Sequence, residues 1–216
     1  MGTRKLGHAA VLLAGGRSTR FGGDKLLARL AGAPLLAHSV RGALALFREV
    51  FLVAKESGRY RGALEAEGLG DLIDRDRVLH LRRDLSRRRT PLAGLQAGLT
   101  HARSEACFVA GADMPFAADR KLLRALEAAL AGHDAAAPRF AGSEQPLCAL
   151  VRRRPCLEAA NALLARRAAG PFALLQAVRT AWIDYESVAP GDRLGLPFLD
   201  ADTRAALRRL ARVLRG

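Results

Sequence analysis

Short apolar runs alternate along the chain with longer segments in which apolar residues recur every three or four positions. The short runs have the length and flanking residues of buried strands, and they cover 9–14, 49–54, 78–81, 106–111 and, more weakly, 147–151 and 181–185. The longer segments have helical periodicity, and they cover 34–47, 91–103, 119–132 and 156–167. Most of them open with Pro or Asp, which the first turn of a helix accepts. This alternation predicts an α/β fold with a mostly parallel sheet covered by helices on both faces.

The length and the even composition favour one folded unit. The chain has 216 residues, half of them apolar, and no tract is biased enough to indicate a linker or disorder. We therefore expect residues 1–216 to form a single domain. No segment approaches 18 consecutive apolar residues, and the N-terminal apolar run leads into glycines instead of a cleavage site. We expect a cytoplasmic protein without membrane segments.

The chain is strongly basic. It carries 35 Lys and Arg against 21 Asp and Glu, a net charge of +14, and the arginines cluster in RRDLSRRR (82–89) and VRRRP (151–155). These clusters fit a solvated surface, and they leave open a site for a small polyanionic substrate. They lack nearby aromatic residues for stacking and match no nucleic-acid motif, which argues against nucleic acid as the partner.

One stretch, LLAGGRSTRFGGDK (12–25), has no packing purpose of its own. Its spacing fits neither the P-loop nor the dinucleotide fingerprint GxGxxG. Adjacent glycines directly after a strand, Gly15 and Gly16, let backbone N–H groups approach a ligand closely. The cations that follow, among them Arg20 and Lys25, suit a triphosphate; the alternative is a surface loop with incidental charge.

A second polar segment belongs to the same rim of the predicted sheet. Ligands bind beyond the carboxyl ends of parallel strands, where the loop 14–25 and the segment GADMPF (111–116) should meet. Asp113 follows a buried strand, where a carboxylate needs a cation or hydrogen-bond donors. Mg²⁺ binds one or two carboxylates together with substrate phosphate oxygens. A cationic glycine loop opposite such an aspartate predicts a nucleotidyl-transfer site.

These motifs resemble those of a known family. LAGGRSTRFGGDK is similar to the LAGGxSxRxGxDK signature of the molybdenum cofactor guanylyltransferases, and GADMPF is similar to their GCDMPF. TPLAGL (90–95), QPLCALV (145–151) and FLDADTRAAL (198–207) resemble further family segments in the same order. The resemblance spans nearly the whole chain. It implies a Rossmann-like, three-layer α/β/α nucleotidyltransferase fold.

The resemblance also implies an activity and a site. The activity is transfer of GMP from GTP-Mg²⁺ to the phosphate of molybdopterin (molybdenum) cofactor, with release of pyrophosphate. By position, Asp113 would hold Mg²⁺, and Arg20 and Lys25 would act on the phosphates; these three are the candidate catalytic residues. The residues that would contact or shape the nucleotide site are Leu13, Ala14, Gly15, Gly16, Arg20, Lys25, Asp84 and Asp113. Protein partners would be the molybdenum-insertion enzyme and recipient molybdoenzymes.

Three departures bear on the choice of base. Ala54 stands where the family often has Asn, which puts a nucleotide contact in doubt. Asp200 and Asp202 replace two asparagines, and DxDT is closer to the molybdenum cofactor cytidylyltransferases. We interpret Asp202 as the N-cap of a helix that begins near Thr203, and Asp200 as an additional metal ligand. LAGG and DMP, against LAAG and DQP in the cytidylyltransferases, favour guanine.

Two other functions stay open at this point. The same chemistry could use CTP, or transfer to a sugar or lipid phosphate. A non-catalytic nucleotide- or nucleic-acid-binding protein would use the basic surface instead. Retention of both Lys25 and Asp113 argues against that second class.

Overall fold

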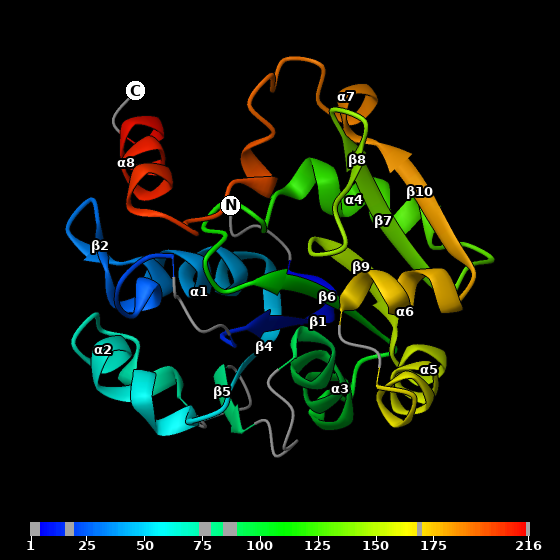
Figure 1. The fold of residues 1–216 in the computed structure, drawn as a ribbon, viewed down its shortest axis with the longest axis horizontal. Helices are drawn as coiled ribbons and strands as arrows, with labels where there is room; N and C mark the ends of the chain where they lie inside the picture. The colour runs from blue at the N-terminus through cyan, green and yellow to red at the C-terminus, as the bar shows by residue number, and fades with distance from the viewer. Residues whose placement is uncertain (1–4, 16–19, 74–78, 84–89, 168–169, 215–216) are drawn as a thin grey trace.

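A twisted, mostly parallel sheet forms the centre of the molecule (Figure 1). The computed structural model describes residues 5–15, 20–73, 79–83, 90–167 and 170–214. The strand order is β10-β7-β9-β6-β1-β4-β5, with β8 paired to β7 and a separate β2-β3 hairpin. The strands are β1 (Leu6–Leu13), β2 (Arg29–Leu30), β3 (Ala33–Pro34), β4 (Phe47–Ala54), β5 (Leu79–Arg83), β6 (Ala106–Gly111), β7 (Ala135–Phe140), β8 (Ser143–Glu144), β9 (Ala149–Arg152) and β10 (Thr180–Asp184).

All six predicted strands are present, and the parallel pairing is confirmed for β6, β1, β4 and β5. The sequence missed β7, whose segment AAAPRF lacks the β-branched residues that mark strands. It also did not indicate that β9 runs antiparallel between β6 and β7.

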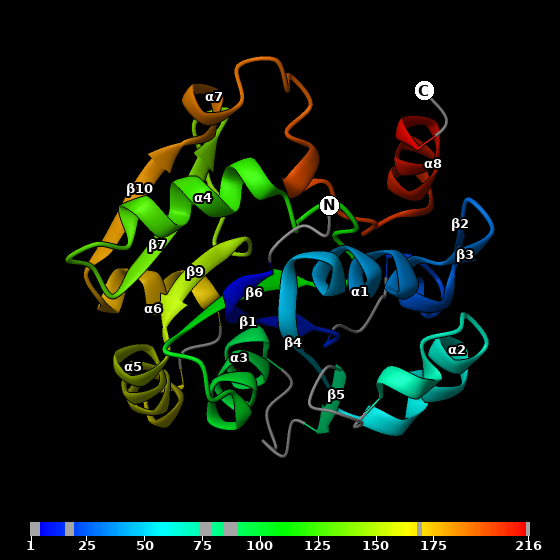
Figure 2. The same cartoon turned by 180° about the vertical axis from the view of Figure 1, so that it is seen from behind.

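Helices cover both faces of the sheet, as predicted. The helices are α1 (Leu35–Leu46), α2 (Arg61–Glu65), α3 (Pro91–His101), α4 (Arg120–Ala129), α5 (Arg153–Ala165), α6 (Pro171–Ala177), α7 (Tyr185–Val188) and α8 (Arg204–Val213). In Figure 1 α3 and α5 lie below the sheet, and Figure 2 shows α1 and α4 on its other side. None of the helices in the described ranges is long and apolar enough to cross a membrane.

The alternation of side chains along β1 explains the three layers. Successive residues of a strand point to opposite faces. Val11 and Leu13 therefore belong to the cluster formed with α3, α5 and α6. Ala10 and Leu12 belong to the other cluster, which α1 and α4 complete. Because both faces of β1 are buried, its sequence is a continuous apolar run and not an alternating one.

Close packing of α3 on β1 depends on Gly98. A Cβ atom at this position would lie 2.3 Å from Cγ1 of Val11. Gly94, on the same helix, has room, because a Cβ there would make an ordinary contact of 3.5 Å with Leu13.

We expect Gly98→Ala to lower the free energy of unfolding. Overpacking a buried contact costs about 1–3 kcal/mol, which exceeds the gain of roughly 1 kcal/mol in helix propensity. Gly94→Ala is the matched control, and it should keep or raise the melting temperature because it gains propensity without a clash. Thermal unfolding of the two variants checks this, and equal stability of both would contradict the described approach of α3 to β1.

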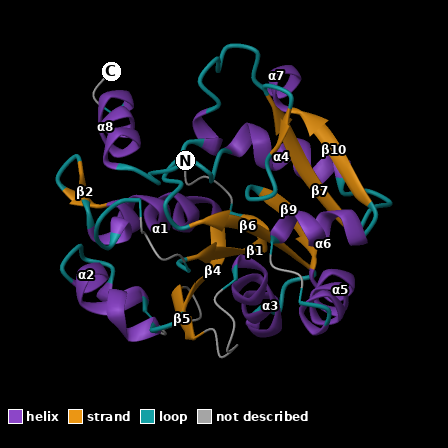
Figure 3. Ribbon diagram, viewed as in Figure 1, coloured by secondary structure: helices purple, strands orange, loops and turns teal. Residues whose placement is uncertain are grey.

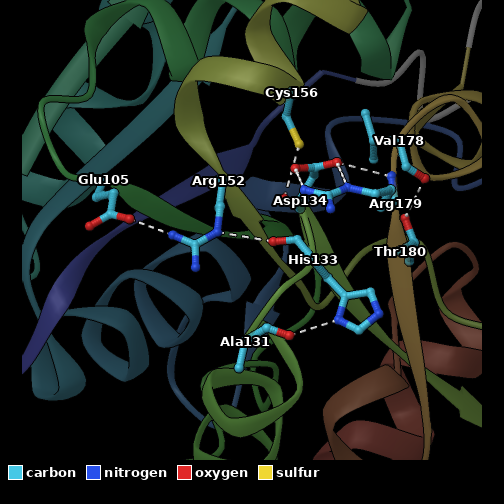
Figure 4. Close-up of polar contacts among 9 residues, drawn as sticks. All are labelled: Glu105, Ala131, His133, Asp134, Arg152, Cys156, Val178, Arg179 and Thr180. Carbon is cyan, nitrogen blue, oxygen red and sulfur yellow. Dashed lines mark hydrogen bonds and ion pairs between the residues drawn. The ribbon is translucent and has the colours of Figure 1, made fainter.

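The outer part of the sheet is tied by a polar network around Asp134 (Figure 4). The Asp134 carboxylate accepts hydrogen bonds from Nε and Nη2 of Arg179, each at 3.1 Å, and from its backbone N–H at 3.2 Å. Next to it, Nε of Arg152 donates to the carbonyl of His133 at 3.0 Å. These bonds join the start of β7 to the start of β10 and the end of β9. The hydrogen bonds from Arg179 lower the pKa of Asp134 below its ordinary value.

This shift predicts a pH dependence of stability. A carboxylate with a lowered folded-state pKa stabilises the fold above its unfolded pKa, and this contribution is lost as the pH falls through the folded pKa. Asp134→Asn should therefore melt below the wild type at neutral pH, and the difference should shrink as the pH falls through the lowered folded-state pKa of Asp134. Glu158→Gln, which removes an exposed ion pair with Arg154, is the control and should change little. A difference for Asp134→Asn that stays constant with pH would contradict this explanation.

Candidate functional site

A cavity of about 350 Å³ lies at the carboxyl ends of the central strands. Its walls come from segments far apart in the sequence, and in Figure 3 β1 and β6 point toward the side on which α8 and the β2 hairpin lie. The lining residues are Leu13, Ala14, Gly15, Arg20, Asp24, Lys25, Leu26, Tyr60, Pro91, Gly111, Asp113, Met114, Leu147, Asp200 and Asp202. The volume falls in the range of small-molecule sites. The predicted meeting of the loop 14–25 with GADMPF is thus confirmed.

A lysine between two carboxylates forms the polar centre of this cavity. The Lys25 ammonium donates to Oδ2 of Asp113 and to Oδ1 of Asp202, the latter at 2.5 Å. Arg20 reaches the other oxygen of Asp202, also at 2.5 Å. The side chains of Lys25 and Asp113 are each only 14% exposed, so this pair is largely shielded from water. Ion pairs therefore connect three segments that are distant in the sequence, namely those that contain Lys25, Asp113 and Asp202.

The ionisation of these groups follows from their contacts. Burial opposes the charge on Lys25, but the charges and hydrogen bonds of the two carboxylates outweigh it and raise its pKa above 10.5. The hydrogen bond from Lys25 lowers the pKa of Asp202, and the charge of Arg20 adds to this effect. Lys25 and Asp202 therefore remain ionised near neutral pH.

Asp200 has a different environment in the same cavity. Its Oδ1 accepts the backbone N–H of Asp202 at 3.1 Å. Burial raises its pKa above the ordinary value, and the neighbouring charges of Asp202 and Asp113 act in the same direction. A nearby cation would relieve this cost.

The backbone of β1 and β6 sets the place of Asp113. The N–H of Ala112 donates to the carbonyl of Leu13 at 3.0 Å, which continues the pairing of the two strands to the rim. Gly111 ends β6, and a Cβ there would lie 2.5 Å from Oδ1 of Asp113. Glycine at this position lets the carboxylate fold back against the strand end.

The structure brings most of the predicted site residues together. Leu13, Ala14 and Gly15 form the wall at the end of β1, and Arg20, Lys25, Asp113 and Asp200 line the same cavity. Gly16 and Asp84, both predicted nucleotide contacts, lie outside the described residues. Ala54, at the end of β4, is buried and has no polar side chain to offer.

The interpretation of Asp202 as an N-cap was wrong. Thr203 caps α8, because its Oγ1 accepts the N–H of Ala206 at 3.1 Å. Asp202 is thereby free to face Lys25 and Arg20. Thr90 has a similar role and caps α3 by accepting the N–H of Ala93.

Asp24 and Tyr60 also line the cavity, although the sequence did not predict them as site residues. Asp24 stands within the glycine-loop signature, directly before Lys25, and this position was a usable signal. Tyr60 belongs to no motif, and only the folded chain brings it to the cavity.

The sequence matches the family described as MobA-like NTP transferase domain over residues 10–182. The chain belongs to this family. It is a nucleotidyltransferase, and the resemblance drawn from the glycine loop is confirmed. The matched range contains both Lys25 and Asp113 and ends before Asp200.

Similar proteins carry consistent names. A protein of Natronomonas pharaonis named "Probable molybdenum cofactor guanylyltransferase" is 33% identical over 153 residues, 70% of this chain and 71% of the relative. A protein of the same name from Pelotomaculum thermopropionicum is 30% identical over 198 residues, 91% of this chain and 88% of the relative.

Solved structures support the fold. Molybdopterin-guanine dinucleotide biosynthesis protein A from Archaeoglobus fulgidus superposes with a TM-score of 0.74 at 22% identity and covers 96% of this chain and 98% of that one. The 2-C-methyl-D-erythritol 4-phosphate cytidylyltransferase of Thermus thermophilus superposes with a TM-score of 0.64 at 17% identity, over 97% and 100% of the two chains. The three-layer nucleotidyltransferase fold is therefore confirmed.

Proposed function

We propose that this enzyme transfers GMP from GTP to the phosphate of molybdopterin cofactor and releases pyrophosphate. The observation that carries the proposal is the cluster of Lys25, Asp113 and Asp202 beside the glycine-loop wall. Relatives named molybdenum cofactor guanylyltransferases add support for the base and the acceptor.

The donor set fits a divalent cation. The carboxylates of Asp113 and Asp202 both accept hydrogen bonds from the positively charged ammonium group of Lys25, so the two carboxylates lie close together around one cation. Within the described part of the chain, no group of three or more His, Cys, Asp or Glu side chains could hold a metal by itself. Mg²⁺ usually takes one or two carboxylates and completes its shell with phosphate oxygens and water. Asp113 would hold it, with Asp200 or Asp202 as a second ligand, and it would neutralise charge on the phosphates.

The proposed reaction needs no general base from the protein. An acceptor phosphate oxygen, already ionised near neutral pH, attacks the α-phosphorus of GTP. The bond from the α-phosphorus to the oxygen bridging to the β-phosphate breaks, and pyrophosphate leaves with that electron pair. The main barrier is the approach of two anions. Lys25 and Arg20 reduce this repulsion and stabilise the charge that develops in the transition state.

Nucleotide binding would rearrange the cluster. Lys25 and Arg20 are bound to carboxylates in the structure, so a triphosphate must compete with Asp202 for both. A divalent cation that binds with the nucleotide would replace the positive charge of the Lys25 ammonium next to the carboxylates. The exchange links phosphate binding to metal binding.

CTP is the second candidate nucleotide, and the pair Asp200 and Asp202 favours it. Both aspartates line the cavity, as the DxDT pattern of the cytidylyltransferases would require. LAGG and DMP favour GTP.

The protein partners that we propose are the molybdenum-insertion enzyme and recipient molybdoenzymes, because an unstable cofactor must pass between proteins.

Pyrophosphate release measured with each of GTP, CTP, ATP and UTP tests the proposal, with molybdopterin cofactor or a sugar phosphate as acceptor. We expect kcat/KM for GTP with molybdopterin to exceed the other combinations by at least about tenfold, within the range that contacts to a base can provide. Preference for CTP would establish the second candidate. Nucleotide binding without pyrophosphate release in any of these combinations would refute molybdopterin cofactor as the acceptor.

A further inference from the structure

The described wall of the site cavity carries more negative than positive charge. Its charged side chains are two cations, Arg20 and Lys25, and four carboxylates, Asp24, Asp113, Asp200 and Asp202. Both cations are already bound to Asp202. A triphosphate without a metal ion would therefore meet repulsion from the carboxylates and find both cations engaged. The position of Asp202 decides how accessible the two cations are to phosphate.

Asp202 stands just before α8, and α8 is anchored beside the lysine segment. Leu210, on the inner face of α8, is fully buried in the apolar cluster that also contains Leu26 and Leu30. Leu207, one turn earlier, packs against the same cluster. Figures 1 and 2 both show α8 beside the β2 hairpin, which follows the lysine segment in the chain. The C-terminal helix is thus packed onto the residues that directly follow Lys25.

A cation–π contact joins the start of α8 to the cationic segment 20–25. The guanidinium carbon of Arg204, the first residue of α8, lies 5.3 Å from the centroid of the Phe21 ring. Phe21 is only 5% exposed, although neither apolar cluster of the described residues includes it. Phe21 follows Arg20, and Arg204 comes two residues after Asp202. The cation–π contact and the ion pair between Arg20 and Asp202 therefore connect the same two segments.

We propose that Phe21 and Arg204 are positioning residues, whose contact holds the start of α8 in place and keeps Asp202 on Arg20 and Lys25. A nucleotide without metal must displace Asp202, and the start of α8 with it, to reach the two cations. A metal-bound nucleotide brings positive charge to Asp202, so the segment stays in place. This inference rests on the proposed function, because it concerns nucleotide binding at the same site. It gives α8, which lies beyond the matched range 10–182, a part in selecting the metal-bound nucleotide.

Calorimetry on the full chain tests this inference without measuring catalysis. The dissociation constant of GTP is measured with Mg²⁺ and with EDTA for the wild type, Phe21→Leu and Arg204→Gln. We expect each variant to bind metal-free GTP about two- to fivefold more tightly than the wild type, the range expected for loss of one exposed cation–π contact. With Mg²⁺ the same variants should bind GTP no more tightly than the wild type. The preference for the metal-bound nucleotide should therefore become smaller.

Conservative variants and a matched control identify the contact itself. Phe21→Tyr keeps the ring and Arg204→Lys keeps the cation, so both should bind metal-free GTP as the wild type does. The variant with both Phe21→Leu and Arg204→Gln should show no more effect than either change alone, because the two side chains share one contact. Arg208→Gln, at an exposed arginine one turn further along α8, removes the same charge and should not tighten binding. Loss of positive charge alone would weaken the binding of GTP.

The outcomes separate the positioning role from the proposed function. A wild type that neither binds GTP-Mg²⁺ nor releases pyrophosphate would refute the proposed function itself. If the wild type does both, unchanged constants for Phe21→Leu and Arg204→Gln would overturn only the positioning role. Weaker binding of metal-free and metal-bound GTP alike would also overturn it, since the contact would then serve stability alone. A wild type that binds GTP equally well with Mg²⁺ and with EDTA would overturn it too.

Discussion

Replacing Asp113 by asparagine is expected to lower kcat/KM by about a thousandfold while the protein stays folded. The change keeps the size of the side chain and removes the charge that would hold a divalent cation. Lewis-acid stabilisation by a bound metal contributes several kcal/mol to the transition state, and each 1.4 kcal/mol is a factor of about ten in rate. Pyrophosphate release at saturating Mg²⁺ measures the effect.

Two observations would distinguish this explanation from general damage. Asp71→Asn, at an exposed aspartate of the 3-10 helix Gly70–Leu72, should leave activity unchanged. The variant Asp113→Asn should also need a higher Mg²⁺ concentration for half-maximal rate. Nearly full activity at an unchanged Mg²⁺ requirement would exclude Asp113 as the metal ligand.

Replacing Lys25 by alanine is expected to lower kcat/KM by about a hundredfold or more. Lys25 is the most shielded cation of the cluster, and a preorganised donor at a site of developing charge is worth roughly 10²–10³ in rate. Removal also leaves Asp113 and Asp202 facing each other without the ammonium between them. We therefore expect added Mg²⁺ to raise the melting temperature of Lys25→Ala more than that of the wild type.

The control for this variant is Lys121→Ala, at an exposed lysine of α4 outside the site cavity. It should match the wild type in rate and in its response to Mg²⁺. A Lys25→Ala variant with wild-type kcat/KM would remove the lysine from the proposed chemistry, whatever its effect on stability.

Local patterns were sufficient to predict most of the fold. The buried strands β1 and β6 are continuous apolar runs, and the amphipathic segment of α4 begins at the Asp119 N-cap. β7 escaped prediction because its alanines and Pro138 carry no strand preference, and only pairing with β9 and β10 makes it a strand. Tertiary context decided what local preference left open.

The site was predictable where its residues stand in contiguous motifs. Lys25 and Asp113 follow strands whose carboxyl ends share one rim, so general rules of parallel sheets placed them together. Asp202 was misread because a polar residue before a helix has two roles that one sequence cannot separate. Thr203 took the cap, and Asp202 was left to join the cluster. Tyr60 had no local signal at all.

A crystal of the protein soaked with GTP and Mn²⁺ would show whether the cavity at the ends of β1 and β6 binds the nucleotide and its metal. We expect anomalous density for the metal within direct bonding distance of a carboxylate oxygen of Asp113, with the ammonium of Lys25 moved onto the phosphates. The same map shows whether Asp200 or Asp202 supplies a second ligand, and it shows the guanine ring next to the wall formed by Leu13, Ala14 and Gly15. A nucleotide bound outside this cavity, or a metal that does not contact Asp113, would refute the proposed site.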